Sequence, residues 1–205
     1  LKSREAYSFP NGSDPTHPGP WNPTGESAIH KIRKKVKKYL DQDRYEHTLG
    51  VMYTSASLAM CYGEDVNDAM IAGLLHDCAK CIPPKKKIRL CKKYHIHITE
   101  SEYANPSLLH AKLGAYIAAE KYHIKDQMIL SAIHCHTTGK PHMTMPDKIL
   151  FISDYIEPGR KDAPHLPELR KLAFQDIDEC LYLILKDTLS YLQTRNLTLD
   201  PMTEK

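Results

Sequence analysis

Apolar residues recur at helical spacing along most of the chain. Residues 29–40 set isoleucine, valine, tyrosine and leucine against six lysines and arginines, which predicts a basic amphipathic helix. Residues 45–61 repeat the apolar pattern and run up to Gly63, a residue typical of a helix C-terminus. A third helix is expected at residues 66–76, with further helices at 83–94, 107–122, 127–136, 146–155 and 166–193.

No segment shows the sustained alternation of apolar and polar residues that predicts a strand. The expected fold class is therefore all-α, a globular helical bundle whose interior can present polar groups from several helices. Residues 1–26 contain five prolines with several glycines and serines, which predicts a disordered tail. Residues 27–205 show no break in composition and are expected to form one domain.

Composition narrows the class of protein. A net charge of +3, from 28 basic and 25 acidic residues spread along the chain, argues against non-specific nucleic-acid binding and is compatible with small phosphorylated substrates. No apolar run approaches the roughly 20 residues that cross a bilayer, and no leader is visible, so we expect a soluble, cytoplasmic protein. The six irregularly spaced cysteines are expected to be reduced. A homodimer is left open.

The adjacent pair His76-Asp77 is the first candidate for chemistry. It follows four apolar or small residues at the end of an expected buried helix. An unpaired carboxylate there would cost several kcal/mol, which a cation could offset. The pair also suits a site with two cations, because the carboxylate can bridge them while the imidazole binds one.

Other histidines and aspartates stand in comparable places on other helices: His47, His110, His136 and Asp154. Imidazole and carboxylate ligands together suit iron, manganese or zinc. A competing metal signal is the spacing Cys78-x-x-Cys81. Structural zinc usually requires a second ligand pair, and redox cysteines at this spacing open a helix rather than close one, so we interpret these two as ordinary semi-buried residues.

The chain resembles a known family, the YqeK-type HD-domain hydrolases, which are symmetrical bis(5'-nucleosyl)-tetraphosphatases of bacteria. The resemblance covers about residues 28–203. It is carried by five strings: Arg44-Tyr45-Glu46-His47-Thr48-Leu49-Gly50, Ala72-Gly73-Leu74-Leu75-His76-Asp77-Cys78-Ala79-Lys80, Asn105-Pro106-Ser107-Leu108-Leu109-His110, Ala132-Ile133-His134-Cys135-His136-Thr137-Thr138-Gly139 and Asp154-Tyr155-Ile156-Glu157-Pro158-Gly159-Arg160. The last two strings separate this family from generic HD proteins.

The resemblance implies two divalent metal ions, with iron as the expected metal and manganese or zinc left open. It implies that His47, His76, Asp77 and Asp154 hold one ion, and that His110 and His136 hold the second, with Asp77 as the bridge. His134 stands where the family often has a basic residue such as arginine. The Thr-Thr-Gly that follows aligns His136 with the family ligand and leaves His134 to contact substrate or to be exposed.

The implied reaction is cleavage of diadenosine tetraphosphate at its middle anhydride into two ADP. Lys80, one helical turn beyond His76, is expected to reach phosphate and to act with Asp77 in catalysis. Arg160 follows a Pro-Gly turn, where a guanidinium can bind phosphate oxygens bidentately. The remaining expected substrate contacts are the loop residues Thr137, Thr138 and Gly139.

Three alternatives stay open. An HD-type nucleotidase or dNTP phosphohydrolase acting on mononucleotides would use the same ligands. A catalytically silent nucleotide-binding protein would keep the helical bundle, although the complete ligand set argues against it. Nucleic-acid binding through the lysines of residues 34–38 is the third, and it predicts an affinity that falls steeply with salt.

Overall fold

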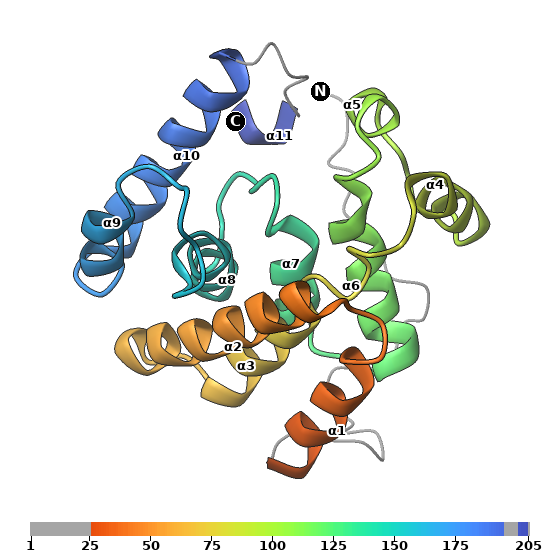
Figure 1. Cartoon of the computed structure of the whole chain (residues 1–205), viewed down its shortest axis with the longest axis horizontal. Helices are drawn as coiled ribbons and strands as arrows, with labels where there is room; N and C mark the ends of the chain where they lie inside the picture. Colours follow the sequence, from red (N-terminus) through yellow and green to blue (C-terminus); the bar gives the residue numbers. More distant parts are fainter. Residues whose placement is uncertain (1–25, 195–200, 205) are drawn as a thin grey trace.

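The structure is a computed structural model that describes residues 26–194 and 201–204. Its helices are shown in Figure 1: α1 Glu26–Val36, α2 Gln42–Tyr62, α3 Val66–Leu75, α4 Pro84–Lys93, α5 Glu100–Ala104, α6 Leu109–Tyr122, α7 Gln127–Cys135, α8 Met145–Ile156, α9 Leu166–Leu172, α10 Ile177–Thr194 and α11 Pro201–Glu204. No strand occurs among these described residues, which confirms the all-α class. None of the described helices has both the length and the apolarity needed to cross a bilayer.

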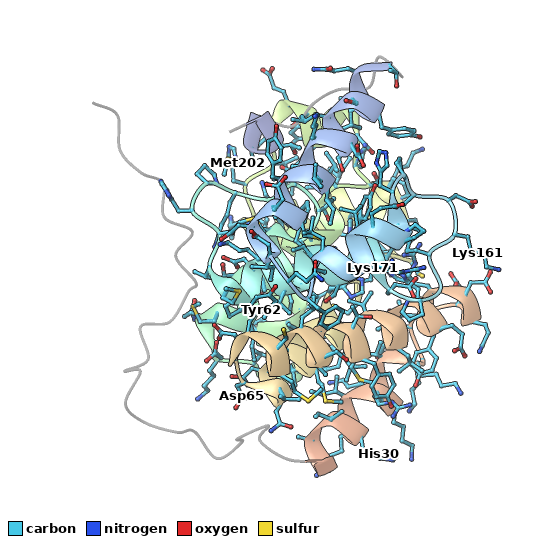
Figure 2. The ribbon with its side chains drawn as sticks, turned by 90° about the vertical axis from the view of Figure 1, so that its left-hand side faces the viewer. His30, Tyr62, Asp65, Lys161, Lys171 and Met202 are labelled. Atoms are coloured by element: carbon cyan, nitrogen blue, oxygen red, sulfur yellow. The ribbon has the colours of Figure 1, made fainter. Side chains whose placement is uncertain are left out.

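Helices α2, α3, α7 and α8 pack against one another and form the centre of the molecule (Figure 1). Helix α6 covers α7 and carries α4 on its outer side, while α9 and α10 pack against the opposite side through α8. In the side view, His30 of α1 and Met202 of α11 lie at opposite ends of the molecule (Figure 2). The hydrophobic core is fully closed at residues such as Met52, Leu74 and Leu109, each with no exposed surface.

Local sequence fixes the ends of α2, the helix that carries His47. The Asp41 carboxylate accepts a hydrogen bond from the Arg44 backbone N–H and caps the N-terminus. Gly63 ends the helix with φ 73°, a left-handed conformation that suits glycine, as the sequence predicts. The cap places His47 in the second turn of α2.

Gly73 lets α2 and α3 approach backbone to backbone. A Cβ atom on Gly73 would lie 2.7 Å from the Met52 Cα, so a side chain has no room without separating the helices. We expect Gly73→Ala to lower the free energy of unfolding by about 2 kcal/mol, measured by urea denaturation. Gly114→Ala is the comparison, with a smaller expected loss, because outside its own helix the nearest atom to its Cβ, the His76 carbonyl oxygen, would lie at 3.3 Å. Equal losses in both variants would contradict this explanation.

Residues 166–193 do not form one helix, so that prediction was wrong. The chain breaks after α9, and the Asp176 carboxylate accepts from the backbone N–H groups of Asp178 and Glu179 at 3.1 and 3.0 Å, which starts α10. The apolar pattern continues past this cap, so the pattern alone does not indicate it.

Two other helices differ from the prediction. The first helix ends at Val36 rather than residue 40, and the short α5, with its Thr99–Glu102 capping box, was not predicted. The tail expected at residues 1–26 lies outside the described residues except for Glu26.

Candidate metal centre

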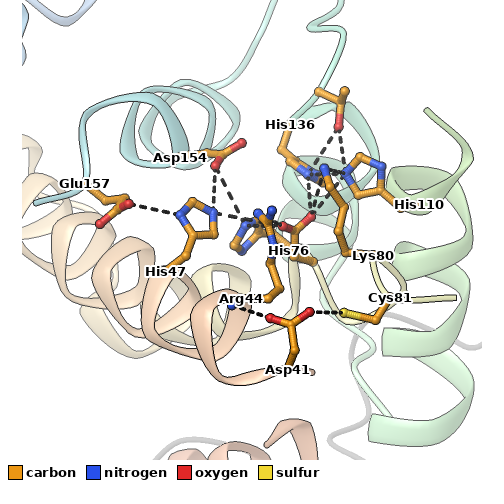
Figure 3. Close-up of polar contacts among 12 residues, drawn as sticks. Asp41, Arg44, His47, His76, Lys80, Cys81, His110, His136, Asp154 and Glu157 are labelled. Atoms are coloured by element: carbon orange, nitrogen blue, oxygen red, sulfur yellow. Dashed lines mark hydrogen bonds and ion pairs between the residues drawn. The ribbon is translucent and has the colours of Figure 1, made fainter. Parts of the chain in front are cut away.

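Five helices bring the predicted histidines and aspartates to one place (Figure 3). His76 and Asp77 directly follow α3, and His136 directly follows α7. Three other residues lie within helices: His47 in α2, His110 in the first turn of α6 and Asp154 in α8. The apolar parts of these helices pack in the core, so their polar side chains converge at one level of the bundle.

Asp77 is at the centre of this cluster, and its two carboxylate oxygens face different histidines. Its Oδ2 lies 3.5 Å from His76 Nε2 and 4.0 Å from His47 Nε2. Its Oδ1 lies 3.1 Å from His110 Nε2 and 3.7 Å from His136 Nε2. A single carboxylate therefore connects two sets of imidazole nitrogens.

Asp154 completes the set on the Oδ2 side. Its Oδ1 lies 3.0 Å from His47 Nε2 and 4.0 Å from His76 Nε2. Ligand atoms of His47, His76 and Asp154 all lie within 4.8 Å of one another, as do those of His76, Asp77 and His136. Both groups have the donor types and the spacing that a metal ion requires.

The orientation of the imidazoles is fixed by their other ring nitrogen. The Nδ1 atoms of three histidines lie 2.6–2.7 Å from the carbonyl oxygen three residues earlier: His76 from Gly73, His110 from Ser107 and His136 from Ile133. A carbonyl oxygen only accepts, so each Nδ1 must carry the hydrogen. Each Nε2 then points its lone pair into the cluster.

His47 is oriented differently from the other three. Its Nδ1 lies 3.1 Å from Oε1 of Glu157, a carboxylate in the turn after α8 whose residue is only 3% exposed. The Glu157 side chain also fills the space beside Gly50, where a Cβ would lie 2.4 Å from Glu157 Oε2. Glu157 has no predicted role in the sequence, although it lies one helical turn beyond Asp154.

Three ligand atoms of this cluster have no hydrogen-bond donor among the described residues. Nε2 of His47, Nε2 of His76 and Oδ1 of Asp77 are buried without a hydrogen-bond partner in the described part of the chain. The Nε2 atoms of His110 and His136 lie 3.1 Å apart, and a hydrogen bond between them would require a doubly protonated ring. Burial lowers the pKa of His110 to about 4, so its ring is neutral near pH 7. Cations are the groups that such a set of donors fits.

The two carboxylates of the cluster are ionised. Burial acts to raise the pKa of Asp77, but the surrounding imidazoles of His76, His110 and His136 outweigh burial and hold it well below its usual range. The pKa of Asp154 is also lowered, because the neighbouring imidazoles of His47 and His76 outweigh burial. Negative charge and imidazole lone pairs thus meet at one point, and the cluster fits divalent metal ions.

Three of the predicted phosphate contacts lie against this cluster. Lys80 Nζ lies 3.7 Å from Asp77 Oδ1 and 3.2 Å from His110 Nε2. Thr137 Oγ1 lies 3.2 Å from Nε2 of His110. Arg160 binds Asp154 twice, through Nη2 to Oδ1 at 2.9 Å and through Nε to the backbone carbonyl at 2.9 Å. Cationic and hydroxyl donors therefore border the cluster.

Thr138, Gly139 and His134 lie elsewhere. They line a separate cavity of about 400 Å³ beside the first turns of α6, and the Thr138 hydroxyl donates to the Gly139 carbonyl oxygen at 3.2 Å. Burial, together with the charges of Lys112 and Lys140, lowers the pKa of His134 to about 4. The structure thus places His136 in the candidate metal cluster and His134 in this second cavity.

Arg44 begins the first string of the family resemblance, and the sequence predicts no role for it. Its Nη1 lies 2.9 Å from Asp77 Oδ2, so the guanidinium reaches the centre of the cluster. Arg44, His47 and Arg160 also line an open cleft of about 1040 Å³ between the start of α2 and the turn after α8. A signal in the sequence could have identified Arg44: it lies near the start of a helix, three residues before the ligand candidate His47.

The two thiols of the Cys78-x-x-Cys81 spacing face different neighbours. Cys78 Sγ donates to the Gly114 carbonyl oxygen at 3.6 Å, and burial raises the pKa of this thiol to about 12. Cys81 is exposed, and its Sγ lies 3.4 Å from Asp41 Oδ2. This arrangement does not form a thiolate metal site.

Comparison with known proteins agrees with this geometry. Residues 44–159 match the HD domain family, and this range includes every residue of the cluster. The crystal structure of a predicted HD superfamily hydrolase involved in NAD metabolism from Clostridium acetobutylicum superposes with a TM-score of 0.82 at 38% identity, covering 85% of this chain and 92% of that chain. The helical fold is therefore that of an HD-domain hydrolase.

Two curated proteins named symmetrical bis(5'-nucleosyl)-tetraphosphatase are similar over nearly their whole length. The protein of Bacillus subtilis is 39% identical over 170 residues, which cover 82% of this chain and 89% of that protein. The protein of Staphylococcus aureus is 34% identical over 172 residues, which cover 83% of this chain and 88% of that protein. The chain belongs to the HD-domain family of symmetrical bis(5'-nucleosyl)-tetraphosphatases.

Proposed function

We propose that this protein hydrolyses diadenosine tetraphosphate at its middle anhydride and releases two ADP, using two divalent metal ions. The observation that carries the proposal is the position of Asp77, whose two oxygens face separate sets of imidazole nitrogens. The named activity of the similar proteins from B. subtilis and S. aureus supplies the substrate.

The proposed ligands divide into two groups about Asp77. His47, His76, Asp154 and Asp77 Oδ2 would hold the first ion, and His110, His136 and Asp77 Oδ1 would hold the second. Mixed imidazole and carboxylate donors without thiolate favour iron or manganese, and they also accept zinc. We propose iron as the native metal, which metal analysis of anaerobically purified protein would test.

When bound, two such ions activate a water molecule and withdraw charge from the phosphoryl oxygens. The side chains of the protein bind and orient the substrate. Arg44 and Arg160 line the open cleft beside His47, where each guanidinium can move from its carboxylate partner to phosphate oxygens. Lys80 brings a third positive charge to the Oδ1 side of Asp77. Attack of water on one central phosphorus breaks the bridging P–O bond, and each half of the substrate leaves as ADP.

Thr137 is the proposed hydroxyl donor to the substrate beside the second metal group. Thr138 and Gly139 would shape its loop, in which Gly139 has φ 69°. Both residues line the separate cavity, so we propose that they act through the position of Thr137 and not by direct contact with substrate. Membership of the family separately supports a small nucleotide as the substrate.

Product analysis tests the proposed function directly. We expect protein loaded with iron under anaerobic conditions to convert diadenosine tetraphosphate to ADP alone, with one ¹⁸O atom from labelled water in half of the ADP. Anion-exchange chromatography and mass spectrometry measure both results. ATP with AMP as products would indicate asymmetric cleavage, and release of phosphate only from mononucleotides would favour the HD-type nucleotidase; either outcome rejects the proposal.

A further inference from the structure

Charge is spread along most of the chain, but residues 78–99 depart from this pattern. They contain seven lysines and arginines and no aspartate or glutamate. Because the whole chain has a net charge of +3, the remainder carries a net charge of −4. This segment includes Lys80 at the metal centre and all of α4. A positive field is thus concentrated on one side of the cluster.

The exposed cations of α4 are not neutralised by the protein. Lys85, Lys86, Arg89, Lys92 and Lys93 are all exposed, and none of them forms an ion pair in the described part of the chain. Lys92 and Lys93 lie over tyrosine rings, at 5.5 and 5.3 Å from the ring centroids. The first three have no side-chain partner of any kind among the described residues. Their charge is directed to solvent.

This arrangement costs local stability. The first turn of α4 holds three consecutive lysines, no acidic residue and no side-chain cap. Positive charges at a helix N-terminus oppose the helix dipole and so destabilise the first turn. Lysines that neighbour one another also repel. Residues that break a local rule in this way are expected where function requires them.

Lys87 ties this basic helix to the metal centre. Its residue is 3% exposed, and its Nζ donates to the Lys80 carbonyl oxygen at 3.0 Å. Burial and the Lys80 charge lower the pKa of Lys87. Lys80 in turn reaches Asp77 Oδ1 and His110 Nε2. The first turn of α4 is thus held against the loop that carries Lys80, while Lys85, Lys86 and Arg89 of the same helix are exposed. Helix α4 lies on the outer side of α6 (Figure 1).

We infer that the exposed side chains of Lys85, Lys86 and Arg89 form a docking face for the polyphosphate chain of the substrate, from which the chain passes to Lys80 and the metal centre. This inference rests on the proposed function, because the docking face would bind the polyphosphate chain of the substrate that is hydrolysed at the metal centre. The three cations raise the local concentration of anionic substrate and hold the part of it that is not being cleaved.

The test compares two basic helices of the same chain. We expect the triple variant Lys85→Gln, Lys86→Gln, Arg89→Gln to lower kcat/KM for diadenosine tetraphosphate about tenfold at low ionic strength, while kcat changes less than twofold. The difference should shrink as salt screens the charges, since the Debye length is about 10 Å at 0.1 M. The unfolding temperature should hold or rise, because the repulsion in the first turn is relieved.

The matched control removes three exposed charges from α1 and the turn that follows it, in the variant Lys31→Gln, Lys34→Gln, Lys38→Gln. We expect its kcat/KM and salt dependence to equal those of the unchanged protein. An equal fall in both triple variants would show an effect of net charge alone and overturn the docking face. A fall in unfolding temperature of the α4 variant would assign these residues a structural role and would also overturn it.

Binding of inorganic tripolyphosphate to metal-free protein, measured by calorimetry, separates docking from catalysis. Its affinity should fall in the α4 variant and not in the α1 variant. If the α4 variant alone loses affinity for tripolyphosphate but the unchanged protein cleaves no dinucleoside tetraphosphate, the proposed function is rejected and the docking face is kept. Binding of single-stranded oligoadenylate through α4, without binding of tripolyphosphate, would make nucleic acid the occupant and overturn the inference.

Discussion

Replacement of Asp77 by asparagine should lower kcat by a factor on the order of 10³ or more, because one residue contributes to both proposed metal positions. The asparagine side chain has one oxygen and one NH₂ group in place of two charged oxygens. It can present an acceptor to only one of the two sets of imidazoles. With the bridge and the charge removed, neither ion keeps its full set of ligands.

The measurement is kcat at saturating substrate, together with metal content by mass spectrometry of the purified variant. Asp147→Asn is the matched control, since Asp147 is also a fully buried aspartate, bound to Lys140 at 2.7 Å outside the metal centre. We expect that variant to lose stability and to keep both metal and kcat. An Asp77→Asn protein that retained two ions and normal hydrolysis would show that the centre lies elsewhere.

The residues brought together in the cluster could be predicted because each is a polar residue attached to an apolar helix. Asp77 and Asp154 follow runs that the core requires, so their carboxylates could not point to solvent without removing those runs from the core. His136 shares this placement, since it directly follows the buried end of α7. Periodicity therefore indicated both the helices and the ends at which the polar groups meet.

Other features depend on contacts that no pattern along the chain contains. Arg44 and Lys80 both lie in strings that carry the family resemblance, yet only the fold shows that their side chains reach opposite oxygens of Asp77. The break between α9 and α10 arises where Asp176 caps a new helix within a continuous apolar pattern. A single polar residue there outweighs several apolar ones, because capping decides where a helix starts.

Glu157 is the clearest case of a role that only the fold reveals. Its carboxylate is the partner of His47 Nδ1, whereas the other three histidines use backbone carbonyls. Carboxylate partners of metal-binding histidines fix the tautomer and raise the basicity of the ring. His47 is thus the one ligand candidate among the four whose orientation can be altered by a side-chain substitution.

We expect Glu157→Ala to weaken binding of the ion assigned to His47 by about 10- to 100-fold and to spare the ion assigned to His110 and His136. Glu157→Gln keeps an acceptor for Nδ1–H and loses the charge, so its loss should be smaller. Competition titration with a chelator, followed by the number of ions released in each step, measures this. Gly50→Ala should have a similar effect, since its Cβ would displace the Glu157 carboxylate. Unchanged affinity in all three variants, or equal weakening of both ions, would contradict a specific role in orienting His47.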